Sequence, residues 1–238
     1  MFCQGPVPGG TPSCKNCWGC VIGVILKICE AGEIVLRTLC RELTPDEIVS
    51  APIQELIGSM FDTMRAAPGV GLAAPQIGMP LQLAVIEDRQ VYIDKLPPEH
   101  TAARQRKAVS PHVIVNPRLT LESAAAGLSK GAAAGLSKDE TIEFFEGCLS
   151  LPGFTAIVPR AVAVRVDCLN ERAEPVTIRA RGWYARILQH EIDHLHGALY
   201  IDRMLTRSFM GRENFEHHWK NVSAAEFERL LAVVSDND

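Results

Sequence analysis

The segment Ile-Leu-Gln-His-Glu-Ile-Asp-His-Leu-His-Gly at 187–197 carries side chains that could do metal chemistry. His190 and His194 are four residues apart, so on a helix they lie on one face and both imidazoles can bind a single metal ion. Glu191 follows His190 and can reach a ligand of that metal, which is the H-E-x-x-H arrangement. The alternative is an ordinary helix that carries these residues by chance. A third ligand elsewhere in the chain would favour the metal centre.

Cys148 is the candidate for that third ligand. It lies in Phe-Phe-Glu-Gly-Cys-Leu-Ser-Leu-Pro-Gly at 144–153, between a glycine and turn-forming residues, where the backbone could present its sulfur to a site. A lone cysteine is otherwise a small buried hydrophobe. Three protein ligands would leave an open coordination position for water, as in catalytic metal sites.

A stretch of small residues at 69–78, Gly-Val-Gly-Leu-Ala-Ala-Pro-Gln-Ile-Gly, contains one uncharged polar side chain, Gln76. Small residues let the backbone approach a ligand closely. Taken alone, the stretch is equally a tight loop between a helix and a strand. It is not a phosphate-binding loop, because no Lys-Ser/Thr pair follows the glycines.

The three motifs occur together and in the order G-x-G-L-A-A-P-Q at 69–76, E-G-C-L-S at 146–150 and Q-H-E-x-D-H at 189–194. In this combination the chain resembles the peptide deformylase family, from about Ile25 to Phe209. The insert at 88–111 and Gly-Trp-Tyr-Ala-Arg at 182–186 are similar to the mitochondrial-type members and their bacterial relatives. The resemblance assigns the motif residues as follows: Cys148, His190 and His194 as metal ligands, Glu191 as the catalytic acid/base, Gln76 and the Leu149 amide as oxyanion donors that also bind substrate, and Gly71 as a backbone contact to the substrate.

The family resemblance implies a metallohydrolase that removes the N-formyl group from the formyl-methionine of nascent polypeptides and releases formate. It implies one divalent metal ion, Fe²⁺ in the cell, with Zn²⁺, Ni²⁺ or Co²⁺ able to substitute. The implied partners are N-formyl-methionyl nascent peptides at the ribosome. A bacterial protein would be cytoplasmic, and a eukaryotic one would be in the mitochondrion or plastid.

Several segments must form the scaffold that positions these motifs. Apolar residues recur at helical spacing from Ile53 to Met64 and again from Trp183 to His196, where Gly197 closes the helix. Strands are expected at 81–87, 112–116, 162–168 and 176–180, after a first strand that begins near Val24. The insert at 88–111 is expected to be partly helical, and a last helix to start at Ser223 with Glu226 in a capping box. Helices that do not alternate regularly with strands indicate an α+β fold, with small, mostly antiparallel sheets packed around the metal-binding helix.

The expected boundaries are an N-terminal extension at 1–23, a catalytic domain at 24–212 and a helical tail at 213–238. The extension holds Cys14-x-x-Cys17-x-x-Cys20, which has metal-ligand spacing but no partner pair downstream, so we interpret it as disordered. Within the domain, Ala-Ala-Ala-Gly-Leu-Ser-Lys occurs at 124–130 and again at 132–138. This duplication offers little to bury, and we interpret it as a loop that extends a hairpin between Leu121 and Thr141.

Composition restricts the possible partners. A chain of 238 residues, 47% hydrophobic and 22% charged, is that of an ordinary globular protein with one catalytic domain. The net charge of −4 and scattered basic residues predict neither nucleic-acid nor anionic-membrane binding. The longest apolar run, Val21 to Leu26, is too short to span a bilayer and makes a poor signal peptide. We therefore expect the eight cysteines to be reduced thiols.

Two rival functions would use parts of the same pattern. A zinc endopeptidase would use the same H-E-x-x-H pattern, but such enzymes usually take a third His or Glu, and His217-His218 follows too distantly. His196 lies two residues beyond His194 and faces away from the pair. A non-catalytic metal-binding or ribosome-associated module would not need Glu191 and Gln76. Both alternatives fit the residues less well than a deformylase does.

Overall fold

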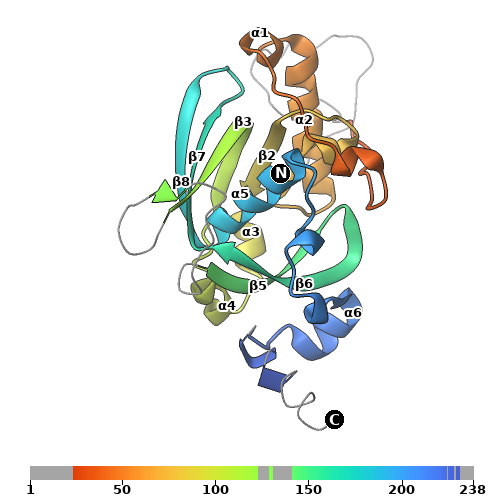
Figure 1. The fold of residues 1–238 in the computed structure, drawn as a ribbon, viewed down its shortest axis with the longest axis vertical. Coiled ribbons are helices and arrows are strands. Elements are labelled where there is room, and N and C mark those ends of the chain that lie inside the picture. The colour runs from red at the N-terminus through yellow and green to blue at the C-terminus, as the bar shows by residue number, and fades with distance from the viewer. Residues whose placement is uncertain (1–23, 123–128, 131–140, 224, 228, 231–238) are drawn as a thin grey trace, which may run out of the picture.

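The computed structural model describes residues 24–122, 129–130, 141–223, 225–227 and 229–230 (Figure 1). The α-helices are α1 (Pro45–Ile48), α2 (Ala51–Ala66), α3 (Gln90–Ile93), α4 (Pro98–Ala103), α5 (Gly182–Leu195) and α6 (Arg212–Asn214). The strands are β1 (Gly71–Ala73), β2 (Leu83–Asp88), β3 (Val109–Glu122), β4 (Ser129–Lys130), β5 (Thr141–Cys148), β6 (Leu151–Ala161), β7 (Ala163–Leu169), β8 (Pro175–Arg181) and β9 (Met210–Gly211). No helix among these residues is long and apolar enough to cross a membrane.

The larger sheet is antiparallel in the order β1-β2-β3-β7-β8, with β4 paired to β3. Successive side chains of a strand point to opposite faces, and β2 uses both. Leu83 and Val85 pack in a cluster with Met60 and Met64 of α2, whereas Ala84 packs with apolar residues of α5. The sheet is therefore covered by α2 on one face and by α5 on the other.

The smaller sheet pairs β5, β6 and β9, and the hairpin β5–β6 ends in the tight turn after Cys148. Figure 1 shows α5 running through the middle of the molecule, beside both sheets. Gln189 connects α5 to β6 of the smaller sheet. Its side chain accepts a hydrogen bond from the Ala161 amide and donates one to the Ala161 carbonyl, both 3.0 Å. The predicted α+β class, with antiparallel sheets around the central helix, is confirmed.

The predicted strands at 81–87, 112–116, 162–168 and 176–180 correspond to β2, β3, β7 and β8. The helix expected from Trp183 is α5, and Gly197 after it has a φ of +73°, in the left-handed region that glycine adopts without strain. The insert is helical in α3 and α4, as predicted. Its base is fixed to β2 by a bidentate ion pair in which the Arg106 Nε donates to the Asp88 Oδ2 at 2.7 Å.

Two expectations about the scaffold are wrong. The first strand near Val24 is absent from the described residues there; the chain is irregular until the 3₁₀ turn Ile34–Arg37, where Ile34 is exposed and only Leu36 is buried. Leu121 and Thr141 do not pair with each other, as a hairpin between them would require, and Ser129–Lys130 of the first copy forms strand β4. Leu121 pairs with β4 and β7 in the larger sheet, whereas Thr141 begins β5 in the smaller one. Most of the duplication, and all of 1–23, lies outside the described residues.

The C-terminal segment packs on the smaller sheet. Phe227 is buried against Phe145 and Trp219, and the Ser223 hydroxyl accepts from the Glu226 amide at 3.2 Å, one half of the predicted capping box. Leu230, three residues after Phe227, is 48% exposed. α6 and the helical turn Phe215–Trp219 that follows it precede the helix expected from Ser223, within the segment predicted to be a helical tail.

Candidate metal centre and active site

Cys148, His190 and His194 converge at the junction of β5 and α5. One ligand atom from each lies within 4.8 Å of the others, and the Cys148 Sγ is 3.2 Å from the His194 Nε2. The two imidazole rings lie 5.0 Å apart, centre to centre, because their residues are one helical turn apart. The sequence therefore predicted correctly that these three side chains come together. They form a possible metal site.

The donor set fits a divalent metal. The His190 Nδ1 is 3.0 Å from the Glu146 Oε2, which leaves the Nε2 for a metal. The His194 Nδ1 is buried and has no hydrogen-bond partner among the described residues. Burial disfavours the Cys148 thiolate, but the adjacent His194 and His190 outweigh it and hold the Cys148 pKa well below its ordinary value. A thiolate beside two imidazoles is a ligand set that suits zinc and other transition metals.

Glu191 lies beside this cluster and is buried, and its Oε2 has no partner in the described part of the chain. Burial raises the pKa of Glu191 to about 7, against the opposing effect of His190 and His194. Gly71 of β1 packs directly on the carboxylate, because a Cβ added at Gly71 would lie 2.2 Å from the Glu191 Oε1. A glycine is thus required here by close approach, in addition to any substrate contact.

Gln76 is held in a single orientation by hydrogen bonds to both ends of its amide. Its Oε1 accepts from the Ala73 amide at 2.9 Å, and its Nε2 donates to the Ser150 hydroxyl at 3.1 Å. The same nitrogen lies 3.5 Å from the Cys148 Sγ. The amide nitrogen therefore faces the metal cluster at Cys148.

A cavity of about 570 Å³ joins these residues. Gly71, Gln76, Cys148, Leu149, His190 and Glu191 all line it, so the structure brings every sequence-predicted site residue to one cavity except His194, which lies beneath. Trp183 and Ile187 of α5 and Phe154 of β6 supply apolar walls. The cavity is shaped to take an apolar side chain next to the metal cluster.

Glu146 is the residue that the sequence reading missed. It is fully enclosed, it accepts from His190, and it receives bidentate donation from Arg160 and a further bond from Arg186. Burial opposes its charge, yet Arg160, His190 and Arg186 hold the Glu146 pKa well below its usual range. Its position two residues before Cys148, inside a motif, was the available signal. A ligand's second nitrogen commonly binds such a carboxylate.

Comparison with known proteins gives the same picture. The polypeptide deformylase family model matches residues 25–209. Peptide deformylase 1A, chloroplastic, from Solanum lycopersicum is 43% identical over 189 residues, covering 79% of this chain and 63% of that protein. Peptide deformylase 3 from Streptomyces avermitilis is 40% identical and covers 88% of this chain and 83% of that protein. The chain thus spans less than two thirds of the length of its plant relative.

Solved structures agree with the fold. A class I type b peptide deformylase from Acinetobacter baumannii, bound to Met-Ala-Ser, has a TM-score of 0.63 at 29% identity and covers 77% of this chain and all of that one. A Synechococcus elongatus peptide deformylase in complex with actinonin has a TM-score of 0.59 at 31% identity, covering 76% of this chain and 82% of that one. Because the family model matches well over half of the sequence, the chain belongs to the polypeptide deformylase family.

Proposed function

We propose that the protein hydrolyses the N-formyl group of nascent peptides that begin with formyl-methionine, releasing formate. The observation that carries this proposal is one cavity in which Cys148, His190 and His194 converge beside the Glu191 carboxylate and the Gln76 amide. Members of the family act on N-formyl-methionyl peptides, and the neighbour from Acinetobacter baumannii holds Met-Ala-Ser. An unbranched methionine side chain fits the apolar walls of the cavity.

Cys148, His190 and His194 would hold the metal. When bound, a divalent cation would act as a Lewis acid and make water nucleophilic near neutral pH. Glu191 would accept the proton of the attacking water and pass a proton to the departing amine. A carboxyl group whose pKa is about 7 is suited to both transfers, because it is neither fully protonated nor fully ionised at that pH.

Gln76 and the Leu149 amide would donate hydrogen bonds to the formyl oxygen as it gains negative charge. Gln76 is suited to this because Ala73 and Ser150 fix its amide before substrate arrives. Such preorganised donors need no reorientation in the transition state, and the loss of one typically costs about 3 kcal/mol. Gly71 would contact the substrate backbone from the opposite wall of the cavity.

The decisive experiment is formate release from formyl-Met-Ala by protein purified without oxygen. An unformylated peptide with an internal Met-Ala bond is the control, since a zinc endopeptidase would cleave it. Formate without cleavage of the control supports the proposal, and cleavage of the control alone contradicts it. The cysteine at the third ligand position favours the deformylase, because endopeptidases of this type take His or Glu there.

For the native metal we propose Fe²⁺, with Zn²⁺, Ni²⁺ or Co²⁺ able to replace it. The proposal rests on the family, since a mixed thiolate and imidazole set suits several of these ions. Elemental analysis of protein purified anaerobically from its own cells would test it, and stoichiometric zinc with no iron would contradict it. An iron-thiolate centre would also lose activity in air.

The relatives' names bear on location and partners. For this chain we propose a plastid or mitochondrion, because relatives from Solanum lycopersicum and Arabidopsis thaliana, each 43% identical, carry these compartments in their names. Fractionation of source cells tests this location. Recovery of the protein in the cytosol alone would contradict it.

The proposed partners are nascent chains at the ribosome. The proposed domains are a dispensable extension at 1–23, a catalytic domain at 24–212 and a tail at 213–238.

A further inference from the structure

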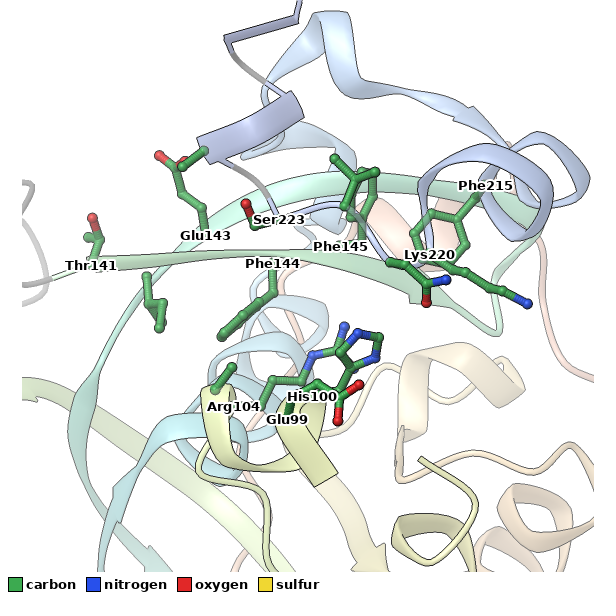
Figure 2. Close-up of a pocket in the computed structure, with 15 residues that line it drawn as sticks. Glu99, His100, Arg104, Thr141, Glu143, Phe144, Phe145, Phe215, Lys220 and Ser223 are labelled. Atoms are coloured by element: carbon green, nitrogen blue, oxygen red, sulfur yellow. The ribbon is translucent and has the colours of Figure 1, made fainter. Parts of the chain in front are cut away.

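A second cavity of about 630 Å³ lies outside the proposed active site. It is formed between the insert, strand β5 and the C-terminal segment, and only Phe145 lines both cavities. Figure 2 shows Glu99, His100 and Arg104 on the side of β5 to which Phe144 points, with Phe215, Lys220 and Ser223 at the C-terminal side. Phe145, the next residue of the strand, points to the other side. The proposed reaction uses none of the charged side chains in this cavity.

Three arginines, of which Arg104 lines the cavity, lie close to the rings of Trp183 and Phe144. The Cζ atoms of Arg104 and Arg106 lie 5.2 and 5.0 Å from the centre of the Trp183 ring. The Cζ of Arg104 also lies 5.4 Å from the centre of the Phe144 ring, and that of Arg186 lies 5.3 Å from it. Each guanidinium is attracted to the face of a ring, but no ring supplies a full negative charge.

Two of the three cations have carboxylate partners and one does not. Arg106 is paired with Asp88 at 2.7 Å, and Arg186 with Glu146 at 2.5 Å. Within the described ranges, Arg104 makes no ion pair and its guanidinium donates no hydrogen bond. The cluster around Trp183 and Phe144 therefore carries one unmatched positive charge, and it is the one that lines the cavity.

The backbone of Arg104, which carries this unmatched charge, is held in place. The Arg104 carbonyl accepts from the Trp183 amide at 2.8 Å, and Gly182 beside it leaves no room for a side chain, because an added Cβ would lie 2.7 Å from that carbonyl oxygen. Burial, and then the neighbouring Arg106, lower the pKa of Arg104 from its ordinary value. An anion that reached Arg104 would relieve both costs.

We propose that this cavity binds a small organic monocarboxylate with an aromatic or branched apolar body, its carboxylate on the Arg104 guanidinium and its body against the apolar lining that includes Phe144 and Phe215. A planar guanidinium binds a carboxylate through two parallel hydrogen bonds. Glu99 also lines the cavity and disfavours multiply charged anions such as phosphate, whereas His100 and Lys220 are compatible with a single negative charge. The proposal does not depend on the proposed reaction.

The test is a calorimetric titration of the full-length, metal-loaded protein with phenylacetate. We expect a dissociation constant on the order of 1 mM, as for a small ligand with one charged anchor. Neutral phenylacetamide has the same shape without the charge, and acetate has the charge without the ring, so both should bind at least tenfold more weakly. Equal binding of phenylacetate and phenylacetamide overturns the proposal, as does the absence of phenylacetate binding.

Arg104→Gln should weaken phenylacetate binding about ten- to a hundredfold, the range for a lost hydrogen bond to a charged group. Arg118→Gln is the matched control, because Arg118 is exposed and pairs with Glu42 far from the cavity. A carboxylate bound at the metal centre instead would bind Arg104→Gln as tightly as the parent, which overturns the proposal. If Arg104→Gln fails to fold, Phe215→Ala on the opposite wall should weaken binding several-fold, and unchanged affinity there overturns it.

Discussion

The two cavities lie next to each other, and they differ in whether their arginine side chains are paired with carboxylates. Around the catalytic cavity, Arg160 and Arg186 are each only 3% exposed, and both donate to Glu146, whose side chain is 4% exposed and also accepts from His190. In the second cavity, Arg104 has aromatic neighbours but makes no ion pair with a carboxylate within the described part of the chain. A charged group that is removed from water without a partner is costly, so we expect the paired and the unpaired arginines to serve different functions.

The matched charges fix the geometry of the metal centre before a metal or substrate binds. A buried carboxylate held by two arginines cannot rotate away from His190, so it sets the ring's tautomer and direction. The unmatched Arg104 instead leaves a charge for a ligand to satisfy. Changes in the first region should therefore cost metal, turnover or stability, whereas changes remote from both cavities should cost little.

The largest effect is expected for Cys148→Ala. Two imidazoles alone are too few ligands to hold the ion, so metal content should fall from one equivalent to nearly none, and turnover with it. Elemental analysis after gel filtration measures this. A variant that keeps a full equivalent would show that Cys148 is a core residue only. Cys168→Ala is the control, since Cys168 is a buried cysteine in the larger sheet, and it should keep its metal.

Glu191→Ala should lower turnover by about 10²- to 10⁴-fold, the usual effect of losing a general base. It should nevertheless retain its metal, because the three proposed ligands are unchanged. Formate release and elemental analysis on the same sample separate the two quantities. Release of the metal would mean that Glu191 coordinates it, and unchanged turnover would mean that another group moves the proton.

Glu146→Gln should weaken metal binding by about 10- to 100-fold, as expected when a ligand's hydrogen-bond partner is altered. It also leaves Arg160 and Arg186 with a neutral partner, so the free energy of unfolding of the metal-free protein should fall by about 3–5 kcal/mol. Chelator competition and urea unfolding measure the two effects. Glu87→Gln is the matched control, because it breaks the half-exposed Arg65–Glu87 pair without touching the histidines. Glu87→Gln should leave metal affinity unchanged. If both variants lose metal affinity equally, Glu146 has no specific effect on the metal ligands.

A truncation that starts at Val24 should keep both metal and turnover, because 1–23 precedes all the elements that build the metal centre. Its metal content is compared with that of the full chain. Loss of a second metal equivalent would show that Cys14, Cys17 and Cys20 bind one.

The smallest effect is expected for deletion of residues 131–138, one copy of the duplicated segment. Its alanine, glycine and serine content offers little apolar area to bury, so turnover and the melting temperature should change little. Formate release and thermal unfolding check this. A loss of folding would mean that the segment packs against the domain.

The main strands and the central helix could be predicted because their apolar residues follow a local period. β2 and the part of β3 at 113–115 are short runs rich in branched apolar residues, and α5 repeats apolar positions every three to four residues. The first strand near Val24 was predicted from the same kind of apolar run, and it was wrong because nothing in the larger sheet pairs with that segment. Pairing partners are decided by tertiary structure, and composition alone does not reveal them.

By itself, the sequence determined that His190 and His194 share a helix face with Glu191 between them, since four-residue spacing allows no other arrangement on a helix. The motifs also indicated Cys148, Gln76 and Gly71. Only the tertiary structure placed Glu146 against His190 and left Arg104 without an ion pair to a carboxylate among the described residues. Glu146 is 44 positions from His190 and 40 from Arg186 in the chain, and hydrogen bonds across such distances form only once the smaller sheet has packed on α5.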